Sequence, residues 1–301
     1  MAKILLTWEL GLNSGHAVRL AQLAQVFQAA GHVTCFAVQR PDALRRWRDH
    51  AGFAEVRQAP IWPGLLRDND VPPLRGERSW GDLLAAMGMH DSGILEYMLR
   101  CWDAILTDSK ADMVVADFAP ASMLAARGRV PVVAVGTGFT VPPSDGVAFP
   151  LLRGEEPLIA EDALLTVVNR ALQRAGMGAL NALPDMAVAD LACPATFAEL
   201  DPYRKYRKGA VYPPFVSGEA GEAGDGKAVF VYAAVGDPRT VALMRALPLV
   251  VRAGVPVIAW LPGLSAPDAR DLAAAGVQVL SAPATQTAIA AQAKLLVTTG
   301  G

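Results

Sequence analysis

One histidine stands at the start of the first helix that the sequence predicts. His16 follows a short apolar run at residues 4–6 and a glycine-containing loop, and Ser14 is available to cap the helix. From position 18 to 30 the apolar residues recur with helical spacing, and Gly31 is placed to end the helix. Ligands of open α/β sheets bind at the carboxyl ends of the strands, so His16 is placed to act as a base. The alternative is a surface histidine that only caps the helix.

An aspartate at the end of another buried strand is the expected partner of this histidine. Asp117 follows an apolar strand at 113–116 and precedes a helix at 120–127. In a doubly wound sheet of order 3-2-1-4-5 the first and fourth strands are neighbours, which brings Asp117 beside His16. A carboxylate there fixes the tautomer of the imidazole and stabilises the cation that forms when the ring takes a proton. The alternative is that Asp117 caps the following helix. The four strands counted in this way are 3–8, 33–38, 54–57 and 112–116.

Two glycine-histidine pairs carry a resemblance to a known family. The run SGHAVRLAQLAQVFQAAGHVTCFAV contains Gly15-His16 and Gly31-His32. It resembles the amino-terminal signature of the GT-B glycosyltransferases of the UDP-glucuronosyl/UDP-glucosyltransferase-like superfamily. The resemblance implies that His16 is the catalytic base and that Asp117, in a similar "DlvvaD" pattern, orients it. It gives His32 no catalytic role, and we expect this residue in the turn into the second strand.

The same resemblance predicts the domain organisation. It implies an α/β protein of GT-B type, with two Rossmann-type, doubly wound parallel-sheet domains of which the second is incomplete. Residues 1–216 are the predicted acceptor-binding domain, 217–226 a flexible acidic linker, and 227–301 a partial nucleotide-sugar-binding domain in which the α/β rhythm restarts. Another helix follows the loop at 139–160, over residues 160–175.

The donor site is expected in this second domain. We assign Gly236 and Asp237 to it, together with Thr299, Gly300 and Gly301 at the end of the last strand. In the family a His-Gly-Gly motif enters a helix whose amino terminus binds the diphosphate of the donor, and here Thr299 stands at the histidine position. We therefore expect a truncated chain with weak activity or none.

The acceptor site is predicted in loops of the first domain. A proline-rich connection at 58–78 contains Trp62, which we assign to the acceptor site together with Gly15, His90 and Phe139. His90 follows a predicted helix break within 80–108, and it faces either solvent or the cleft of His16. The motif at residues 68–70, Asp-Asn-Asp, is superficially a metal-binding pattern, but it precedes Val-Pro-Pro with no strand nearby. It therefore predicts a solvated loop, and we expect neither a metal nor a cofactor.

Composition excludes several classes of protein. The 301 residues are 52% hydrophobic and 19% charged, which is enough apolar material for a substantial core, and no run is long enough to span a bilayer. The net charge of −2 and the lack of a basic stripe with aromatic residues argue against nucleic acid as a partner. Three cysteines at unrelated spacings argue against disulfides and zinc, and we expect them to be small buried residues.

The start MAKILLTWEL has no signal-peptide pattern, which predicts a cytoplasmic location. A basic helix with Arg45, Arg46 and Arg48 is expected to be solvated, or to contact an anionic membrane weakly.

These observations predict an inverting, metal-independent hexosyltransferase. It moves a sugar from a nucleotide-diphosphate-sugar, such as a UDP-sugar, to a hydroxyl of a small-molecule or lipid-linked acceptor. A dehydrogenase fits badly, because the first loop reads G-x-x-x-G and Gln39-Arg40 offers no carboxylate to a ribose. The alternatives are a non-hydrolysing nucleotide-sugar 2-epimerase of the same fold and a non-catalytic binding remnant.

Overall fold

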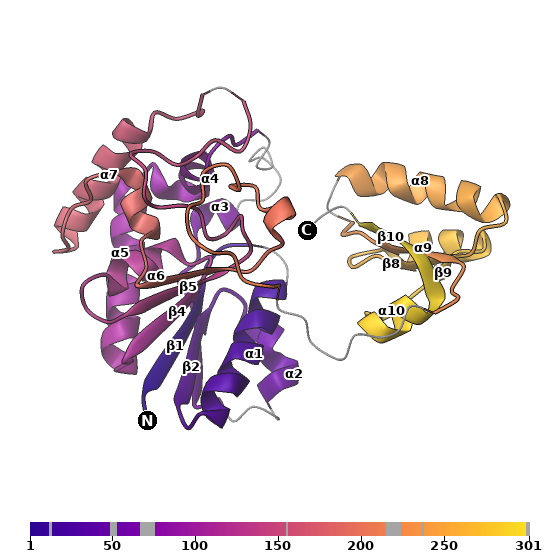
Figure 1. Ribbon diagram of the computed structural model, residues 1–301, viewed down its shortest axis with the longest axis horizontal. Coiled ribbons are helices and arrows are strands. Elements are labelled where there is room, and N and C mark those ends of the chain that lie inside the picture. The colour runs from indigo at the N-terminus through magenta and orange to yellow at the C-terminus, as the bar shows by residue number, and fades with distance from the viewer. Residues whose placement is uncertain are drawn as a thin grey trace. The chain divides into compact units, whose positions relative to one another are not determined.

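The structure is a computed structural model that describes residues 1–11, 14–48, 53–66, 76–154, 156–214, 224–235 and 238–298. The chain divides into two compact units, Met1–Phe215 and Val216–Gly301, each built around a parallel sheet with helices on both faces (Figure 1). We describe each unit by itself. Among the described residues, none of the helices has the length and apolarity needed to span a lipid bilayer.

The first unit has six parallel strands in the order β3-β2-β1-β4-β5-β6. The predicted order of the first five strands is confirmed: the strand order reverses between β1 and β4, while the two strands remain parallel. A sixth strand, β6, was not predicted: its four residues, LACP, are a short apolar run that ends in proline, and the first two are exposed at the sheet edge. The bounds are β1 Lys3–Trp8, β2 Val33–Val38, β3 Glu55–Gln58, β4 Met113–Asp117, β5 Val132–Gly136 and β6 Leu191–Pro194.

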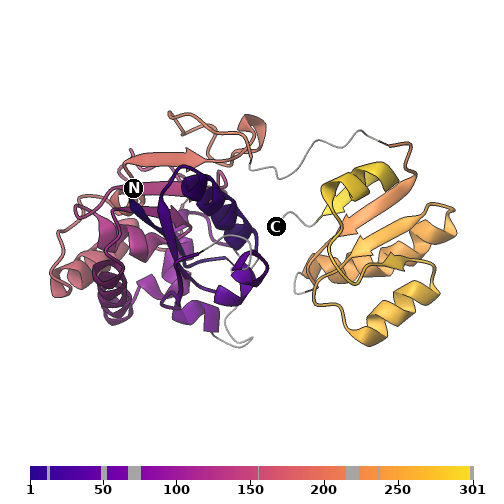
Figure 2. The same ribbon diagram turned by 90° about the horizontal axis from the view of Figure 1, so that it is seen from below.

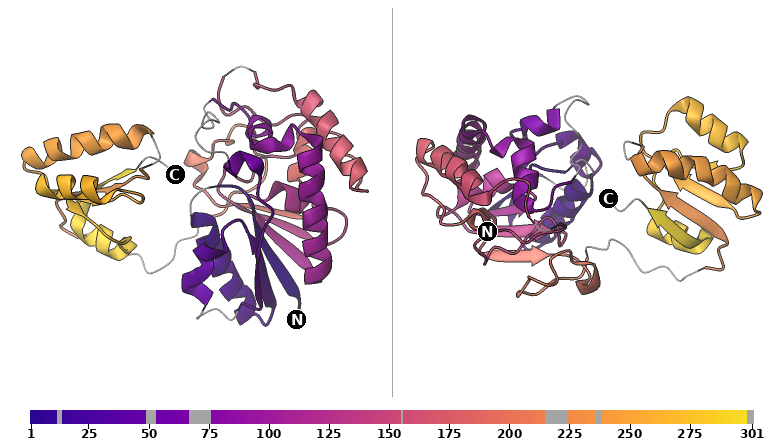
Figure 3. Two further views of the ribbon diagram at one scale, coloured as in Figure 1. Left: turned by 180° about the vertical axis from the view of Figure 1, so that it is seen from behind. Right: turned by 90° about the horizontal axis from the view of Figure 1, so that it is seen from above.

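Alternate residues along the strands enter two separate cores. On β1, Leu5 packs in one apolar cluster with residues of α5, α6 and α7, whereas Ile4 and Leu6 pack in the other with α1. Figure 3 shows these two groups of helices on opposite faces of the sheet. The helices are α1 Gly15–Ala29, α2 Arg45–Arg48, α3 Pro63–Leu66, α4 Trp80–Leu84, α5 Ser92–Ser109, α6 Pro120–Ala126 and α7 Glu161–Arg174.

Local capping explains where several helices begin and end. Ser79 and Asp82 form a reciprocal capping box at the start of α4. The predicted break within 80–108 is confirmed: Gly88 adopts φ +119° in a turn of π-helix, and Asp91 accepts the amides that begin α5. Gly31, with φ +83°, follows the end of α1 as predicted. The expected cap at the other end is corrected, because the Ser14 side chain makes no capping hydrogen bond.

The second unit repeats the predicted α/β alternation on a smaller scale. Its four parallel strands lie in the order β10-β7-β8-β9, with α8 and α9 on one face and α10 on the other (Figure 2). At the edge, β10 leaves Leu295 and Leu296 56% and 57% exposed. The bounds are β7 Ala228–Tyr232, α8 Pro238–Arg252, β8 Val257–Trp260, α9 Ala266–Ala274, β9 Gln278–Val279, α10 Gln286–Gln292 and β10 Ala293–Thr298.

Candidate active site

The histidine and the aspartate singled out in the sequence lie in contact at the carboxyl edge of the first sheet. The register of β1 on β4 pairs Trp8 with Asp117, so the turn that leaves β1 passes beside the end of β4. That turn leads into α1, on whose first turn His16 stands. The distance between His16 Nδ1 and Asp117 Oδ1 is 2.8 Å. The proximity expected from the strand order is therefore present.

The carboxylate of Asp117 is shared between two residues of α1. Asp117 is fully buried, and its second oxygen, Oδ2, forms an ion pair with the guanidinium of Arg19. Arg19 was not identified from the sequence, although its spacing of three residues from His16 places both on one helix face. The interpretation of Asp117 as a helix cap is not supported, because α6 begins after Ala119 without a side-chain cap.

The partners of the imidazole determine which of its nitrogens can act as a base. The carboxylate of Asp117 can accept a hydrogen bond but cannot donate one. In the neutral imidazole Nδ1 therefore carries the proton, and Nε2 keeps its lone pair. One face of the His16 ring stacks on Trp8 at 5.3 Å between centroids, and Phe118 lies at 6.0 Å. A β-carbon on Gly11 would lie 2.4 Å from Nε2, so the ring fits only because this residue is glycine.

A second buried carboxyl lies next to this arrangement and was also not identified from the sequence. Glu9 has no exposed surface, and it accepts a hydrogen bond from the indole Nε1 of Trp62 at 2.7 Å. Burial raises the pKa of the Glu9 carboxyl to about 7, although its hydrogen bonds act in the opposite direction. Trp62 is itself fully buried, which corrects its assignment as a residue that contacts an acceptor.

The other predicted acceptor residues have different surroundings. Gly15 is exposed at the start of α1. Phe139 is half-buried and packs edge-on against Phe118 at 6.1 Å, and Phe118 in turn lies 6.0 Å from the His16 ring. His90 is exposed, and its Nδ1 lies 2.6 Å from the carbonyl oxygen of Ala85, across the turn that precedes α5. A role for these three residues in acceptor binding stays a prediction.

The predicted donor residues cannot be placed in this way. Gly236, Asp237, Thr299, Gly300 and Gly301 lie outside the described residues, as does the Asp-Asn-Asp motif at 68–70. Within the described ranges no group of three or more His, Cys, Asp or Glu side chains is placed to hold a metal ion. Cys35 is buried as expected, and burial raises the pKa of its thiol to about 11, whereas Cys101 and Cys193 are only partly buried.

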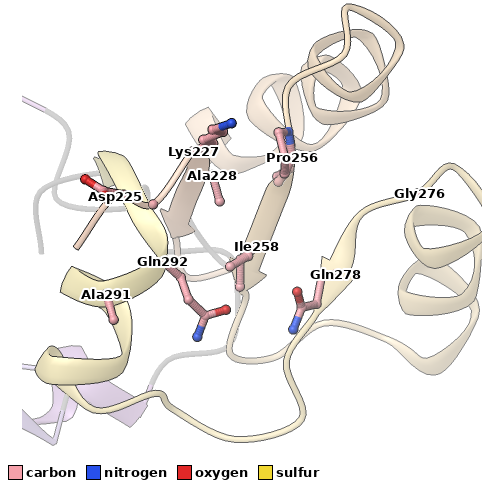
Figure 4. Close-up of a pocket in the computed structure, with 11 residues that line it drawn as sticks. Asp225, Lys227, Ala228, Pro256, Ile258, Gly276, Gln278, Ala291 and Gln292 are labelled. Carbon is pink, nitrogen blue, oxygen red and sulfur yellow. The ribbon is translucent and has the colours of Figure 1, made fainter.

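The second unit has a hollow of about 540 Å³ at the edge of its sheet where the strands begin. Figure 4 shows Lys227 and Ala228, Pro256 and Ile258, and Gln278 around it. These residues mark the amino ends of β7, β8 and β9, whereas ligands of parallel sheets bind at the carboxyl ends. We therefore do not assign this hollow to the donor.

Solved structures share the fold of the whole chain. CalG4, the calicheamicin glycosyltransferase, matches at a TM-score of 0.65 and 16% identity, over 99% of this chain and 74% of that one. The glycosyltransferase SnogD from Streptomyces nogalater matches at 0.60 and 16% identity, over 100% of this chain and 76% of that one. SsfS6 from Streptomyces sp. SF2575, complexed with thymidine diphosphate, matches at 0.57 and 16% identity, over 100% and 77% of the two chains.

These likenesses establish the fold class. The chain has the α/β fold of the GT-B glycosyltransferases, with two Rossmann-like parallel sheets, as the sequence predicts. No protein-family model matches the chain, and no curated protein matches it. At this level of identity the chemistry has to be argued from the side chains of the site.

Proposed function

We propose that this chain is an inverting glycosyltransferase in which His16 is the base. The observation that carries the proposal is the 2.8 Å hydrogen bond between His16 Nδ1 and the buried carboxylate of Asp117. It leaves the lone pair of Nε2 to take the proton of an acceptor hydroxyl, and the imidazolium that results is stabilised by Asp117. The acceptor oxygen then forms a bond to the anomeric carbon of the donor sugar. The bond to the nucleoside diphosphate breaks on the opposite face, and the configuration inverts.

The proposed donor is a nucleotide-diphosphate-sugar. Support comes from two neighbours of the same fold, SsfS6 and VinC, which are described as complexes with thymidine diphosphate and dTDP. We assign donor binding to the second unit, with Gly236, Asp237, Thr299, Gly300 and Gly301, and acceptor binding to the first. Backbone amides at a helix amino terminus can neutralise a diphosphate, so the proposed mechanism requires no metal.

The proposed acceptor is a small molecule or a lipid-linked compound with a reactive hydroxyl. SpnG, another neighbour, is described as complexed with spinosyn aglycone. In this chain we assign acceptor binding to Gly15, which precedes His16 and has open space beside its backbone, and to Phe139, which packs against the same Phe118 as the His16 ring. A cytoplasmic location and a weak membrane contact of the basic helix stay predictions from the sequence.

The test is to replace each of the two histidines of the glycine-histidine pairs. In a transfer assay with UDP-glucose or dTDP-glucose and a panel of hydroxylated acceptors, His16→Ala is expected to lower turnover by roughly 10²–10⁴-fold. His32→Ala is the matched control, because His32 lies in the turn before β2, where its imidazole accepts the backbone amide of Ala2 at 3.2 Å and packs edge-on against Phe27. An active His16→Ala variant would contradict the proposed base, and sugar isomerisation without an acceptor would favour the epimerase.

A further inference from the structure

Glu9 is a fully buried carboxylate to which the proposed chemistry gives no task. It is the first residue after β1, and its exposed fraction is 0%. Burying a carboxylate is unfavourable unless hydrogen bonds replace its hydration. Its oxygen Oε1 accepts from the backbone amide of Ser122 at 2.6 Å, while Oε2 accepts from Trp62 Nε1 at 2.7 Å and from the amide of Ala121 at 3.2 Å.

These hydrogen bonds join the two segments that carry the catalytic pair. Glu9 lies in the turn that runs from β1 into α1, and therefore leads to His16. Ala121 and Ser122 form the first turn of α6, which follows Asp117 by way of Phe118. A second contact joins the same segments, because the amide of Leu10 donates to the carbonyl oxygen of Phe118 at 3.0 Å.

The backbone between Asp117 and α6 needs such support. Phe118 adopts φ +51°, a left-handed conformation that residues other than glycine rarely adopt and that persists where surrounding contacts enforce it. The ring of Phe118 also lies 6.0 Å from the imidazole of His16. Trp8, the residue immediately before Glu9, stacks on the same imidazole with an interplanar angle of 17°. The two aromatic neighbours of His16 are thus attached to the two segments that Glu9 joins.

We propose that Glu9 is a positioning residue for the His16–Asp117 pair, and that it acts by holding the turn after β1 against the first turn of α6. None of its described hydrogen bonds goes to His16, Arg19 or Asp117, and its burial keeps it from an acceptor. Glu9 is therefore not a catalytic residue. The inference rests on the proposed function, because it concerns the geometry of the same pair.

The test compares two buried carboxylates in the full chain. Glu9→Gln keeps the size of the side chain and one carbonyl oxygen, but its NH₂ group faces a donor in either orientation, the amide of Ser122 or Trp62 Nε1 and the amide of Ala121. Asp82→Asn is the matched control. Asp82 is 3% exposed and accepts four backbone amides at 2.9–3.2 Å, and its hydrogen bonds hold the start of α4 and residues 158–159 rather than the catalytic pair.

Two measurements distinguish positioning from a merely structural role. The first is ¹⁵N NMR of the imidazoles, in which His16→Ala assigns the His16 signals among the four histidines. We expect Glu9→Gln to weaken or remove the signature of the Nδ1–H bonded to Asp117, and Asp82→Asn to preserve it. The second is transfer kinetics, in which Glu9→Gln is expected to lower kcat by about 10²-fold, the usual effect of misplacing a reacting group by 1 Å, with little change in KM.

The NMR result decides the inference even for a chain that transfers no sugar. Unchanged His16 signals in a folded Glu9→Gln variant would overturn it. The inference would also be overturned if Asp82→Asn, at the same loss of stability in urea, changed the His16 signals as much as Glu9→Gln does. If Glu9→Gln alters the His16 signals while His16→Ala keeps full transfer activity, the positioning of the ring holds and the proposed base is wrong.

Discussion

The imidazole of His16 and the carboxylate of Asp117 are 101 residues apart in the sequence, and their Nδ1 and Oδ1 atoms are 2.8 Å apart in the structure. The contact follows from the neighbouring positions of β1 and β4 at the point where the order of the sheet reverses. Asp117 is also paired with the guanidinium of Arg19, so its buried charge is balanced by a cation. Each part of this arrangement can be tested separately.

Removing the charge of Asp117 should abolish most of the proposed base function. Asp117→Asn can hydrogen-bond His16 through its carbonyl oxygen or its NH₂ group, and the second orientation selects the wrong tautomer of the ring. We expect turnover to fall by roughly 10²–10⁴-fold in the transfer assay. Asp112→Asn is the control, because Asp112 precedes the same strand and accepts only the amide of Lys3 among the hydrogen bonds described, at 2.7 Å. Equal activity of the two variants would count against the role of Asp117.

Removing Arg19 should destabilise the chain more than removing an exposed arginine. Arg19→Met leaves the fully buried Asp117 without the cation on Oδ2, and loss of one partner of such a pair costs about 3 kcal/mol. Arg129 pairs with Asp103 at the surface, with side chains 39% and 54% exposed, so Arg129→Met should cost less than about 1 kcal/mol. Urea unfolding measures both, and equal losses would show that the Arg19 pair is not specially placed.

A methyl group on Gly11 should displace the imidazole ring of His16. Gly11 has φ +96°, and its added β-carbon would lie 2.4 Å from His16 Nε2, so Gly11→Ala should remove most transfer activity. Gly31 has φ +83° with nothing within 4 Å, so Gly31→Ala carries a similar backbone penalty without the collision. That penalty is roughly 1–2 kcal/mol and should leave turnover unchanged. Similar turnover in both variants would contradict the steric argument.

The raised pKa of Glu9 should make folding stability depend on pH. The carboxyl has a pKa of about 7 in the folded chain against 4.5 for the free group, so the folded state binds the extra proton between these values. Its contribution to stability is fully present below pH 4.5 and is lost as the pH rises through about 7. Relative to Glu9→Gln, the free energy of unfolding should fall by about 3 kcal/mol between pH 4 and 8. Urea unfolding at each pH measures this. If the free energies of unfolding of the two proteins changed equally with pH, the raised pKa of Glu9 would be refuted.

The second unit should be cleaved before the first in limited proteolysis. Its edge strand β10 exposes Leu295 and Leu296, at 56% and 57%, and its apolar clusters are smaller than those that cover β1 and β4. Smaller cores open locally at lower free energy. Limited proteolysis followed by mass spectrometry should therefore find the earliest internal cuts within 224–298. Earlier cuts within 1–210 would reverse this order.

Much of the first sheet was predictable from local sequence. Apolar runs such as residues 113–116, and the helical spacing that follows His16, depend on neighbouring residues alone, and the α/β alternation restricts the order of the strands. His16, at the start of the helix after the first strand, and Asp117, at the end of the fourth, could for that reason be placed together. The edge strand β6 has only four residues and ends in proline, so local sequence does not distinguish it from a loop, and its pairing with β5 defines it.

The tertiary structure decided what surrounds the pair. Arg19 lies 98 positions from the carboxylate that it neutralises, and the amide of Ser122 lies 113 positions from Glu9. Trp62, which the sequence analysis assigned to the acceptor site, is a buried donor to the same Glu9. Periodicity shows which face of an element is apolar, but it does not show which donor will meet a buried carboxylate. That depends on how segments distant in sequence meet at the carboxyl edge of the sheet, because a buried charge is tolerated only where such partners come together.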